Sequence, residues 1–443
     1  MKILLLSDVN VNKVSHKKIR GTEQIVKVIF FELSKIGVDV EILGSDKFAY
    51  DLQFKNESEE VSNFFSRGKS RDSLKFKKLL QEIKPDIVQF HGFSGSSFGL
   101  EHLLACKELS IKTILWHNVP GITCMQSELL YMARTQCDGK FSLTKCTCCR
   151  LNQSIPEFFT YIFGRFGNFS RNSFKNKILD RLLSSRKYSY EFYKTNRLIS
   201  DHFDHVRYGA HWVRKVLLQN DFVDKKLIFI RPSISPEFWE EYSSNKKNFS
   251  RKNENENINE NNKKNVQFIF WGRLIRSKGI HVIANAIKLL NEYDFVLNIV
   301  GDINSGDRSF RKFYSKNKRN KKIIFHGSLN QKSLFKLGKN CDVALIPSSW
   351  FETGPITVYE AFAMGLPVLG TKLGGIEELC KDEVDSFLFE LNNYKELAKN
   401  MIRLIDNPKI INELRNNIPI PRAPQDLGLE IYKVYQKVLN NEN

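Results

Sequence analysis

Short apolar runs alternate with amphipathic stretches along the first 120 residues of the chain. Runs rich in Ile, Leu and Val predict buried strands, and apolar positions that repeat every three or four residues predict helices. The expected strands are 3–6, 38–43, 86–90 and 111–116, and the expected helices are 24–36, 73–83 and 98–109. Strand–helix alternation of this kind predicts a parallel sheet with helices on both faces.

The alternation restarts in the second half of the chain, after two interruptions. Residues 120–200 hold a cysteine cluster and a basic, aromatic segment, and residues 245–265 contain nine Asn and almost nothing apolar. We expect the Asn-rich stretch to be a flexible surface linker that builds no core. Beyond it the expected strands are 266–270, 295–300, 323–325, 343–347 and 367–370, with a helix from Gly279.

The two halves predict an α/β protein with two doubly wound parallel sheets. The expected domains are 1–240, with a Cys-rich insertion at about 120–150, then a linker 241–265, a second domain 266–418 and a C-terminal helix within 419–443. Ligands of such sheets bind outside the carboxyl ends of the strands. A cleft between two such domains would therefore present both sets of strand ends to one substrate.

Composition narrows the class of protein. The chain has 443 residues, of which 42% are hydrophobic, enough for two or three domains with real cores. Its formal charge of +19 favours a polyanionic partner, without choosing between nucleic acid, anionic lipid and phosphorylated small molecules. No stretch approaches the roughly 20 apolar residues of a membrane span. Asp8 and Asn10 end the first apolar run too early for a secretory leader, so we expect a cytoplasmic protein, soluble or peripheral.

The strongest chemical signal is the segment 271–279, WGRLIRSKG, which follows a predicted strand and opens a helix. Backbone N–H groups after Gly272 and the helix dipole would supply partial positive charge, and Arg273 and Lys278 would add full charges. Together they would form a site for a diphosphate. The same pattern taken alone also fits a surface turn with solvated cations.

The second signal is a pair of carboxylates, Glu352 and Glu360, in the segment 352–360, ETGPITVYE. Glu352 lies in a loop after a predicted strand and Glu360 in the helix that follows. Carboxylates there can accept hydrogen bonds from sugar and ribose hydroxyls. Taken alone, the pair also fits a helix-stabilising glutamate and a solvated one. The loop residues that can approach a phosphate or a sugar are Thr353, Gly354, Pro355 and Ile356.

Together, segments 271–279 and 352–360 resemble the two hallmark motifs of the retaining family-4 glycosyltransferases. These enzymes have the GT-B fold, in which two Rossmann-like domains face each other across a cleft. Gly301 and Asp302 at a strand end follow the same pattern, as does 361–378. The resemblance is strong across 266–380 and looser elsewhere.

In the first half, Gly21-Thr22-Glu23 resembles the glycine-rich turn before the first helix, and His117 lies at a matching strand end. Two positions depart from the pattern, because Arg20 and Ile303 stand where glycines are usual.

The resemblance implies a role for each matched residue. Arg273 and Lys278 would bind the donor diphosphate and stabilise it as it leaves, and Glu352 would hold the hydroxyls of the donor sugar. Glu360 would bind the ribose, and His117 would lie near the transferred sugar. The residues that would approach the donor through their backbone are Gly21, Gly272, Gly301, Thr353, Gly354, Pro355 and Ile356.

The resemblance also implies a reaction and its partners. A nucleotide-diphosphate-sugar would donate its sugar, with retention of configuration, to a glycan or a lipid-linked glycan in surface polysaccharide biosynthesis. The leaving phosphate would accept the proton of the acceptor, so the chemistry would rest on positioning and charge stabilisation and would need no divalent metal. An inverting enzyme is the alternative within this fold, with Asp8 or His16 as its base.

The cysteines divide into two groups. Cys124, Cys137, Cys146 and Cys149 are separated by twelve, eight and two residues, with Cys148 as a spare. Such a set could hold a structural Zn²⁺ or an iron–sulfur cluster, or could remain a group of reduced thiols. The remaining three, which fall in predicted core elements, are Cys106, Cys341 and Cys380. Eight cysteines in a chain of this length are no disulfide scaffold.

A basic segment with interleaved aromatic residues does not by itself identify the partner of the protein. Residues 165–197 contain nine Lys or Arg, two acidic residues and several Phe and Tyr. The segment fits either contact with an anionic membrane or a pair of amphipathic helices with solvated cations, and we favour the helices. A nucleic-acid-binding protein without catalysis is the alternative from another class, but no zinc-finger, RRM or helix-turn-helix pattern occurs, so no nucleic acid is expected.

Overall fold

The computed structural model describes residues 1–7, 21–44, 73–92, 98–118, 120–132, 134–151, 162, 182–255 and 265–441. The chain divides into two compact units. Unit 1 comprises Met1–Lys13, Ile29–Arg231 and Leu429–Asn443, and unit 2 comprises Val14–Val28 and Pro232–Gly428. Neither unit is one continuous stretch of sequence.

Unit 1 is built on a six-stranded sheet in the order β2-β1-β3-β4-β7-β8, with every pair parallel. The strands are β1 (Lys2–Ser7), β2 (Asp39–Gly44), β3 (Ile87–Phe90), β4 (Lys112–Trp116), β7 (His205–Tyr208) and β8 (Leu227–Phe229). The helices are α3 (Ser73–Ile83), α4 (Leu100–Glu108), α8 (Ser185–His202), α9 (His211–Gln219), most of α18 (Pro424–Leu439) and the second half of α1 (Gly21–Lys35), whose residues 21–28 belong to unit 2. Side chains of α3, α4 and α9 form one core with the strands.

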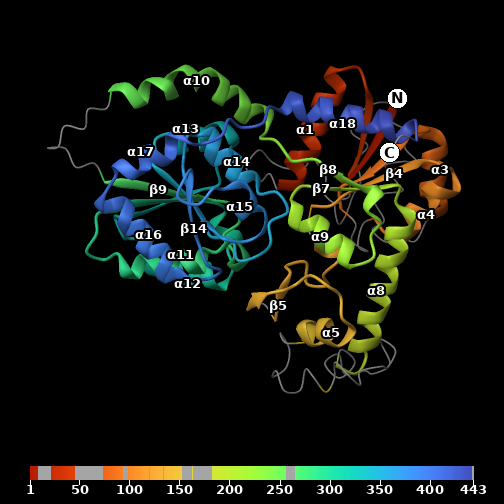
Figure 1. Ribbon diagram of the computed structural model, residues 1–443, viewed down its shortest axis with the longest axis horizontal. Coiled ribbons are helices and arrows are strands. Elements are labelled where there is room, and N and C mark those ends of the chain that lie inside the picture. The colour runs from red at the N-terminus through yellow and green to blue at the C-terminus, as the bar shows by residue number, and fades with distance from the viewer. Residues whose placement is uncertain are drawn as a thin grey trace. The chain divides into compact units, whose positions relative to one another are not determined.

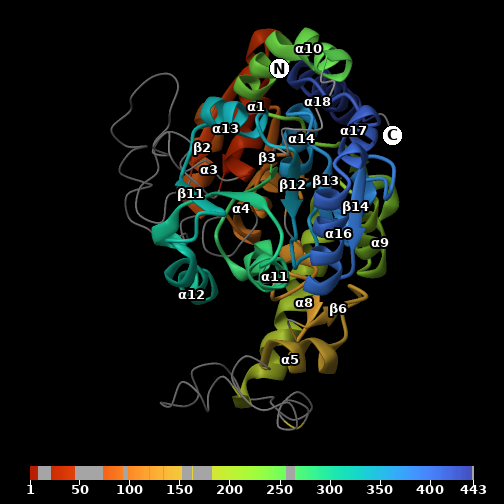
Figure 2. The ribbon, with the colours of Figure 1, turned by 90° about the vertical axis from the view of Figure 1, so that its left-hand side faces the viewer.

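A small lobe of unit 1 follows β4. It contains the 3-10 turn η1 (Pro120–Ile122), the antiparallel pair β5 (Leu130–Tyr131) and β6 (Thr135–Gln136), and helix α5 (Leu143–Leu151). Figures 1 and 2 both show α5 beside the end of α8 that lies away from the sheet. This lobe coincides with the predicted Cys-rich insertion.

Unit 2 repeats the architecture, with a parallel sheet in the order β11-β10-β9-β12-β13-β14. Its strands are β9 (Val266–Trp271), β10 (Phe295–Val300), β11 (Ile323–Gly327), β12 (Val343–Ile346), β13 (Val368–Thr371) and β14 (Ser386–Phe389). Its helices are α10 (Pro236–Asn255), α11 (Ile280–Ala286), α12 (Arg308–Asn317), α13 (Gln331–Gly338), α14 (Ile356–Ala363), α15 (Gly374–Leu379), α16 (Tyr394–Asp406) and α17 (Lys409–Asn416).

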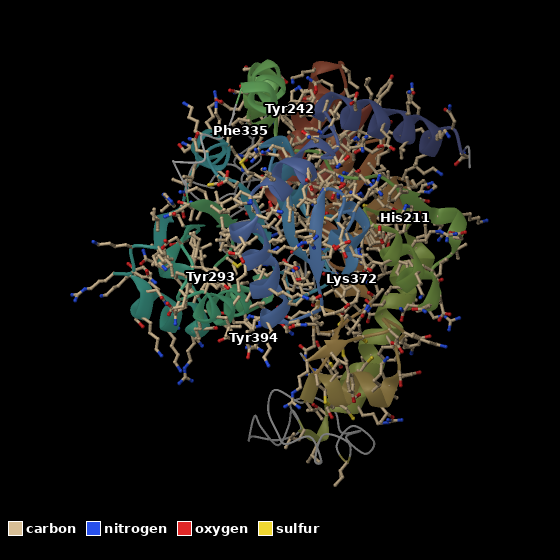
Figure 3. The ribbon with its side chains drawn as sticks, turned by 60° about the vertical axis from the view of Figure 1, so that its left-hand side comes forward. His211, Tyr242, Tyr293, Phe335, Lys372 and Tyr394 are labelled. Carbon is tan, nitrogen blue, oxygen red and sulfur yellow. The ribbon has the colours of Figure 1, made fainter. Side chains whose placement is uncertain are left out.

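Two separate cores cover the two faces of this second sheet. Side chains of α11, α12 and α16 pack on one face, and side chains of α10, α13 and α14 pack on the other. Figure 1 shows these two sets of helices on opposite sides of the strands. Figure 3 labels Tyr242 on α10 and Phe335 on α13, which belong to one of these cores. The predicted fold class, two doubly wound parallel sheets, is confirmed.

The Asn-rich segment differs from the expected linker. Helix α10 extends to Asn255, so the segment begins as a continuation of a helix, while 256–264 lie outside the described residues. The start of this helix is anchored because Phe238 and Tyr242 pack into the core of unit 2. Strands β7, β8 and β14 were not predicted; β7 and β8 are short, and β7 carries a buried Arg207 that masks the strand pattern.

Candidate functional site

The loop after β9 is shaped by glycines. Gly272 has φ +136° and Gly279 has φ +79°, a region that favours glycine. A Cβ added to Gly279 would lie 1.7 Å from the carbonyl oxygen of Pro347, so any larger residue would push the two loops apart. The Ser349 N–H donates to the Ser277 carbonyl at 2.8 Å and ties the same loops together. Lys278 is thereby held against the loop that follows β12.

That second loop buries the carboxylate of Glu352 among donors. Oε1 of Glu352 accepts hydrogen bonds from Lys278 Nζ at 2.5 Å, Ser348 Oγ at 2.8 Å and Trp350 Nε1 at 2.8 Å. The Glu352 carbonyl accepts from the N–H of Gly375 at 2.8 Å, and a Cβ on Gly375 would lie only 2.6 Å from this oxygen. The glycine that opens α15 therefore lets the Glu352 backbone pack directly on that helix.

Charge keeps Glu352 ionised. Burial alone would raise its pKa, but the charge of Lys278 and the hydrogen bonds from Lys278, Ser348 and Trp350 outweigh burial and hold the pKa below its usual value. Lys278 also lies 5.2 Å from the centre of the Trp350 ring. The side chains of Lys278 and Glu352 are 21% and 8% exposed, so the ion pair is largely buried in unit 2.

Glu360 has a different environment, on the first turns of α14. Its Oε2 accepts from Trp271 Nε1 at 2.7 Å, and its Oε1 accepts from Gln24 Nε2 of α1 at 3.4 Å. No ion pair to Glu360 occurs among the described residues. Burial raises its pKa to about 7, against the opposing hydrogen bonds of Trp271 and Gln24. This carboxyl group is therefore poised between its neutral and charged forms near neutral pH.

Positive potential gathers beside these two carboxylates. Arg273 is exposed, and no partner for its guanidinium occurs within the described ranges. Helix α14 begins at Ile356, after Gly354, whose φ is +155°, and its first N–H groups have no intrahelical acceptor. A Cβ on Gly301 would lie 2.4 Å from the carbonyl oxygen of Gly272, so the end of β10 closes tightly against the Arg273 loop.

Unit 1 carries His117, directly after β4. The side chain is 3% exposed, and neither ring nitrogen has a hydrogen-bond partner among the described residues. Burial, and then the charge of Arg207, lower the pKa of His117 to about 4, so the ring is neutral at physiological pH. His91, in contrast, is hydrogen-bonded, with Nε2 2.6 Å from Nε2 of Gln89.

Most predicted donor-site residues of unit 2 come together in the structure. The loops of 271–279 and 352–360 meet through Lys278 and Glu352, and through Trp271 and Glu360. Gly21 belongs to the same unit by its contacts, and a Cβ there would lie 3.7 Å from Ile356 Cδ1. His117 belongs to unit 1, and Asp8 and His16 lie outside the described residues.

Four partners were not foreseen from the sequence. Ser348 and Trp350 flank Glu352 closely in the chain, so their proximity was a usable signal. The long-range partners, Gln24 of Glu360 and Arg207 of His117, gave no such signal in the sequence. A cation inside a strand is nevertheless unusual and could have pointed to Arg207.

Known families and proteins that resemble this chain include glycosyltransferases. Residues 251–419 match the family described as Glycosyl transferases group 1. An uncharacterized glycosyltransferase of Methanocaldococcus jannaschii is 30% identical over 173 residues, which cover 38% of this chain and 44% of that protein. The UDP-Gal:alpha-D-GlcNAc-diphosphoundecaprenol alpha-1,3-galactosyltransferase of Escherichia coli is 30% identical over 34% of this chain and 39% of its own. The chain thus spans less than half the length of these relatives.

Solved structures extend the likeness over the whole chain. Anabaena HepE, solved in complex with UDP-glucose, superimposes with a TM-score of 0.59 at 13% identity and covers 100% of this chain and 99% of its own. Sucrose-phosphate synthase from Thermosynechococcus elongatus gives a TM-score of 0.66 at 12% identity and covers 100% of both chains. The protein has the GT-B fold, as predicted.

Proposed function

We propose that this protein is a glycosyltransferase that moves a sugar from a nucleotide-diphosphate donor to an acceptor. One observation carries the proposal: unit 2 joins Arg273, Lys278 and the start of α14 to two buried carboxylates within a group 1 domain. Cations and free N–H groups suit a diphosphate, and ordered carboxylates suit hydroxyl groups. This arrangement matches the parts of a nucleotide sugar.

The chemical task of the site is to stabilise a leaving diphosphate. When the bond between the sugar and the phosphate breaks, negative charge grows on the phosphate oxygens. Lys278, held by its ion pair with Glu352, and the N–H groups at the start of α14 would stabilise that charge without rearrangement. The exposed Arg273 would add a further positive charge. Glu352 would orient the donor sugar and keep Lys278 in position through their ion pair. Glu360 would accept hydrogen bonds from the ribose.

We further propose that transfer retains the anomeric configuration, with the acceptor attacking from the face of the leaving phosphate. The phosphate would then take the acceptor proton, so no protein base is needed, and the chain's own residues supply positioning and charge. The two unpartnered ring nitrogens of His117, held neutral by burial and Arg207, would contact a hydroxyl of the transferred sugar. No divalent metal enters this scheme.

The proposed acceptor is a glycan or a lipid-linked glycan of surface polysaccharide biosynthesis. The Escherichia coli relative is named for a diphosphoundecaprenol-linked acceptor, and a Klebsiella pneumoniae relative, 28% identical, for its place in a cps region. None of the described helices is both long and apolar enough to cross a bilayer. We propose a cytoplasmic protein. The basic segment 165–197, for which we favour amphipathic helices with solvated cations over contact with an anionic membrane, lies outside the described residues at 165–181.

Donor binding is the first test of the proposed function. We expect one of UDP, GDP or ADP, or a sugar conjugate of it, to raise the melting temperature of the purified protein, and Arg273→Ala to abolish the shift. Arg276→Ala is the matched control, because Arg276 is an exposed cation of the same loop that is assigned no donor contact. An equal shift in Arg273→Ala and wild type would sink the diphosphate assignment. Tight binding of polynucleotide with no nucleotide response would favour the nucleic-acid alternative.

A further inference from the structure

The Cys-rich lobe of unit 1 has little core of its own. Between 120 and 151 it contains one 3-10 turn, a two-stranded pair of two residues each and helix α5. Its buried apolar side chains are few and include Leu129, Leu130, Met132 and Leu151. A segment of this size rarely buries enough apolar surface to hold one conformation without a cross-link or a metal. The donor site described above makes no use of it.

Four thiols of this lobe line a single pocket. Cys124 follows η1, Cys137 follows β6, and Cys146 and Cys149 lie three residues apart on α5, so that they share one face of the helix. Cys148 is also buried on α5 but is not among the residues that line the pocket. All eight cysteines are within the described ranges, and none is in a disulfide.

Backbone N–H groups point at three of these four sulfur atoms. The Met132 N–H donates to Cys149 Sγ at 3.2 Å, and the Ser142 N–H donates to Cys146 Sγ at 3.5 Å. The Gly139 N–H donates to the sulfur of Cys137. A neutral thiol is a weak acceptor, whereas a thiolate is a strong one. In the same lobe the thiols of Cys137 and Cys149 also donate to Asp138 Oδ1 and to the Leu130 carbonyl. The N–H bonds would strengthen if a bound metal ion ionised the sulfurs.

Thiolates in this pocket need a cation between them. The ammonium of Lys145, which also lines the pocket, is already paired with Asp138. Four ionised sulfurs around one pocket would repel one another strongly unless a metal ion neutralised them.

We propose that Cys124, Cys137, Cys146 and Cys149 bind one Zn²⁺ as four thiolates and that this ion braces the lobe. As the described side chains are placed, no three of the His, Cys, Asp and Glu groups already converge on one ion position. Binding would draw the four sulfurs inward, because the affinity of structural zinc sites is large enough to reorient their ligand side chains. A closed tetrahedral set of four thiolates is a structural rather than a catalytic zinc site.

Metal analysis of the purified full-length protein tests the proposal. We expect one zinc per chain by mass spectrometry of the dissolved metal, and none in the double variant Cys146→Ser/Cys149→Ser. Cys148→Ser is the matched control and should keep its zinc, because this cysteine lies on the same helix but outside the pocket. Wild-type protein without metal would overturn the proposal, whether its thiols are free or joined in disulfides. So would iron with acid-labile sulfide, which identifies an iron–sulfur cluster.

A second measurement avoids variants that fail to fold. Titrating native wild-type protein with a mercurial reagent should release zinc, detected with a chromogenic chelator, only as four thiols react. Cobalt-substituted protein should show the strong visible absorption of a tetrahedral thiolate site. Release without thiol modification, or octahedral cobalt spectra, would overturn the four-thiolate assignment. Nucleotide-induced stabilisation, measured on the same samples, reports the donor site of unit 2 independently, so failure of one proposal is distinguishable from failure of the other.

Discussion

At the scale of single residues, the donor-site carboxylates differ because their partners differ. Glu352 receives three donors, one of them cationic, whereas Glu360 receives neutral donors from Trp271 and Gln24. Both side chains are buried, so the presence of Lys278 decides which one stays charged. The two glutamates therefore respond differently to pH.

Glu360 should make donor binding pH-dependent. Its pKa is raised from 4.5 to about 7 in the folded protein, and the charged form accepts hydrogen bonds from ribose hydroxyls more strongly than the neutral form does. We expect the affinity for the nucleotide diphosphate, measured by calorimetry, to fall as the pH drops from 8 to about 6. Glu360→Gln should bind weakly at every pH. A wild-type affinity that is flat across this range would remove Glu360 from the ribose site.

The same group should lower stability at high pH. The folded protein holds the Glu360 proton more tightly than the unfolded chain does, so its stabilising contribution is complete below about pH 4.5 and is lost as the pH rises through about 7. The raised pKa corresponds to roughly 3 kcal/mol. Urea unfolding should show a smaller loss of stability over this range in Glu360→Gln than in wild type. Glu377→Gln, an exposed glutamate of α15, is the control.

Removing Lys278 should leave a buried charge without its partner. We expect Lys278→Met to lower the free energy of unfolding by about 3 kcal/mol, as for other buried pairs broken from one side. Lys278→Met/Glu352→Gln should recover most of this loss, because the uncompensated carboxylate is gone. Urea unfolding of the four proteins in the cycle measures the coupling. Additive single losses would mean that the pair contributes no coupling energy.

At the scale of elements, the loop between β9 and α11 depends on one glycine. Gly279 and Gly37 have nearly the same φ, +79° and +81°, but a Cβ on Gly37 would meet nothing within 4 Å. Gly37→Ala should therefore cost only the backbone strain of about 1–2 kcal/mol. Gly279→Ala should destabilise unit 2 further and abolish nucleotide binding, since the Cβ would displace Pro347. The melting temperatures of the two variants, and the rise in each when nucleotide is added, measure the difference. Equal effects in Gly37→Ala and Gly279→Ala would contradict the close contact between Gly279 and Pro347.

The elements that could be predicted from the sequence are those with strong local patterns. The predicted strand 266–270 agrees with β9 to within one residue, because apolar β-branched and aromatic residues dominate this segment. The sequence predicts a linker from residue 241, where the structure continues α10 to Asn255. The polar Asn and Lys residues that follow Phe238 and Tyr242 show no periodic apolar pattern that would indicate a helix. Likewise, the contact between Lys278 and Glu352 spans 74 residues and depends on Gly279 passing Pro347, which no local pattern encodes.

At the scale of the whole molecule, the end of the chain supports the first sheet. Residues 429–443 group with unit 1, and the Tyr435 hydroxyl donates to Gln89 Oε1 at 2.7 Å, while Gln89 contacts His91. All three side chains are buried, so the chain of polar groups is shielded from water.

Tyr435→Phe should leave the Gln89 oxygen buried and unsatisfied, at a cost of about 1–3 kcal/mol. Tyr432→Phe, on the same helix but only half-buried, should cost little. Chemical denaturation of both variants checks the difference. Comparable stability of the two would show that the terminal helix contributes no buried polar contact to unit 1.

The path of the chain through the two units limits how the protein can be recombined. Unit 2 takes its first segment, 14–28, from the N-terminal part of the chain, and unit 1 takes its last from 429–443. A chimaera that exchanges donor specificity at one crossover near residue 232 would therefore separate Gln24 from the Glu360 it contacts. Recombination that preserves each unit needs four junctions, so a natural hybrid made by a single crossover would start with mismatched partners in both halves.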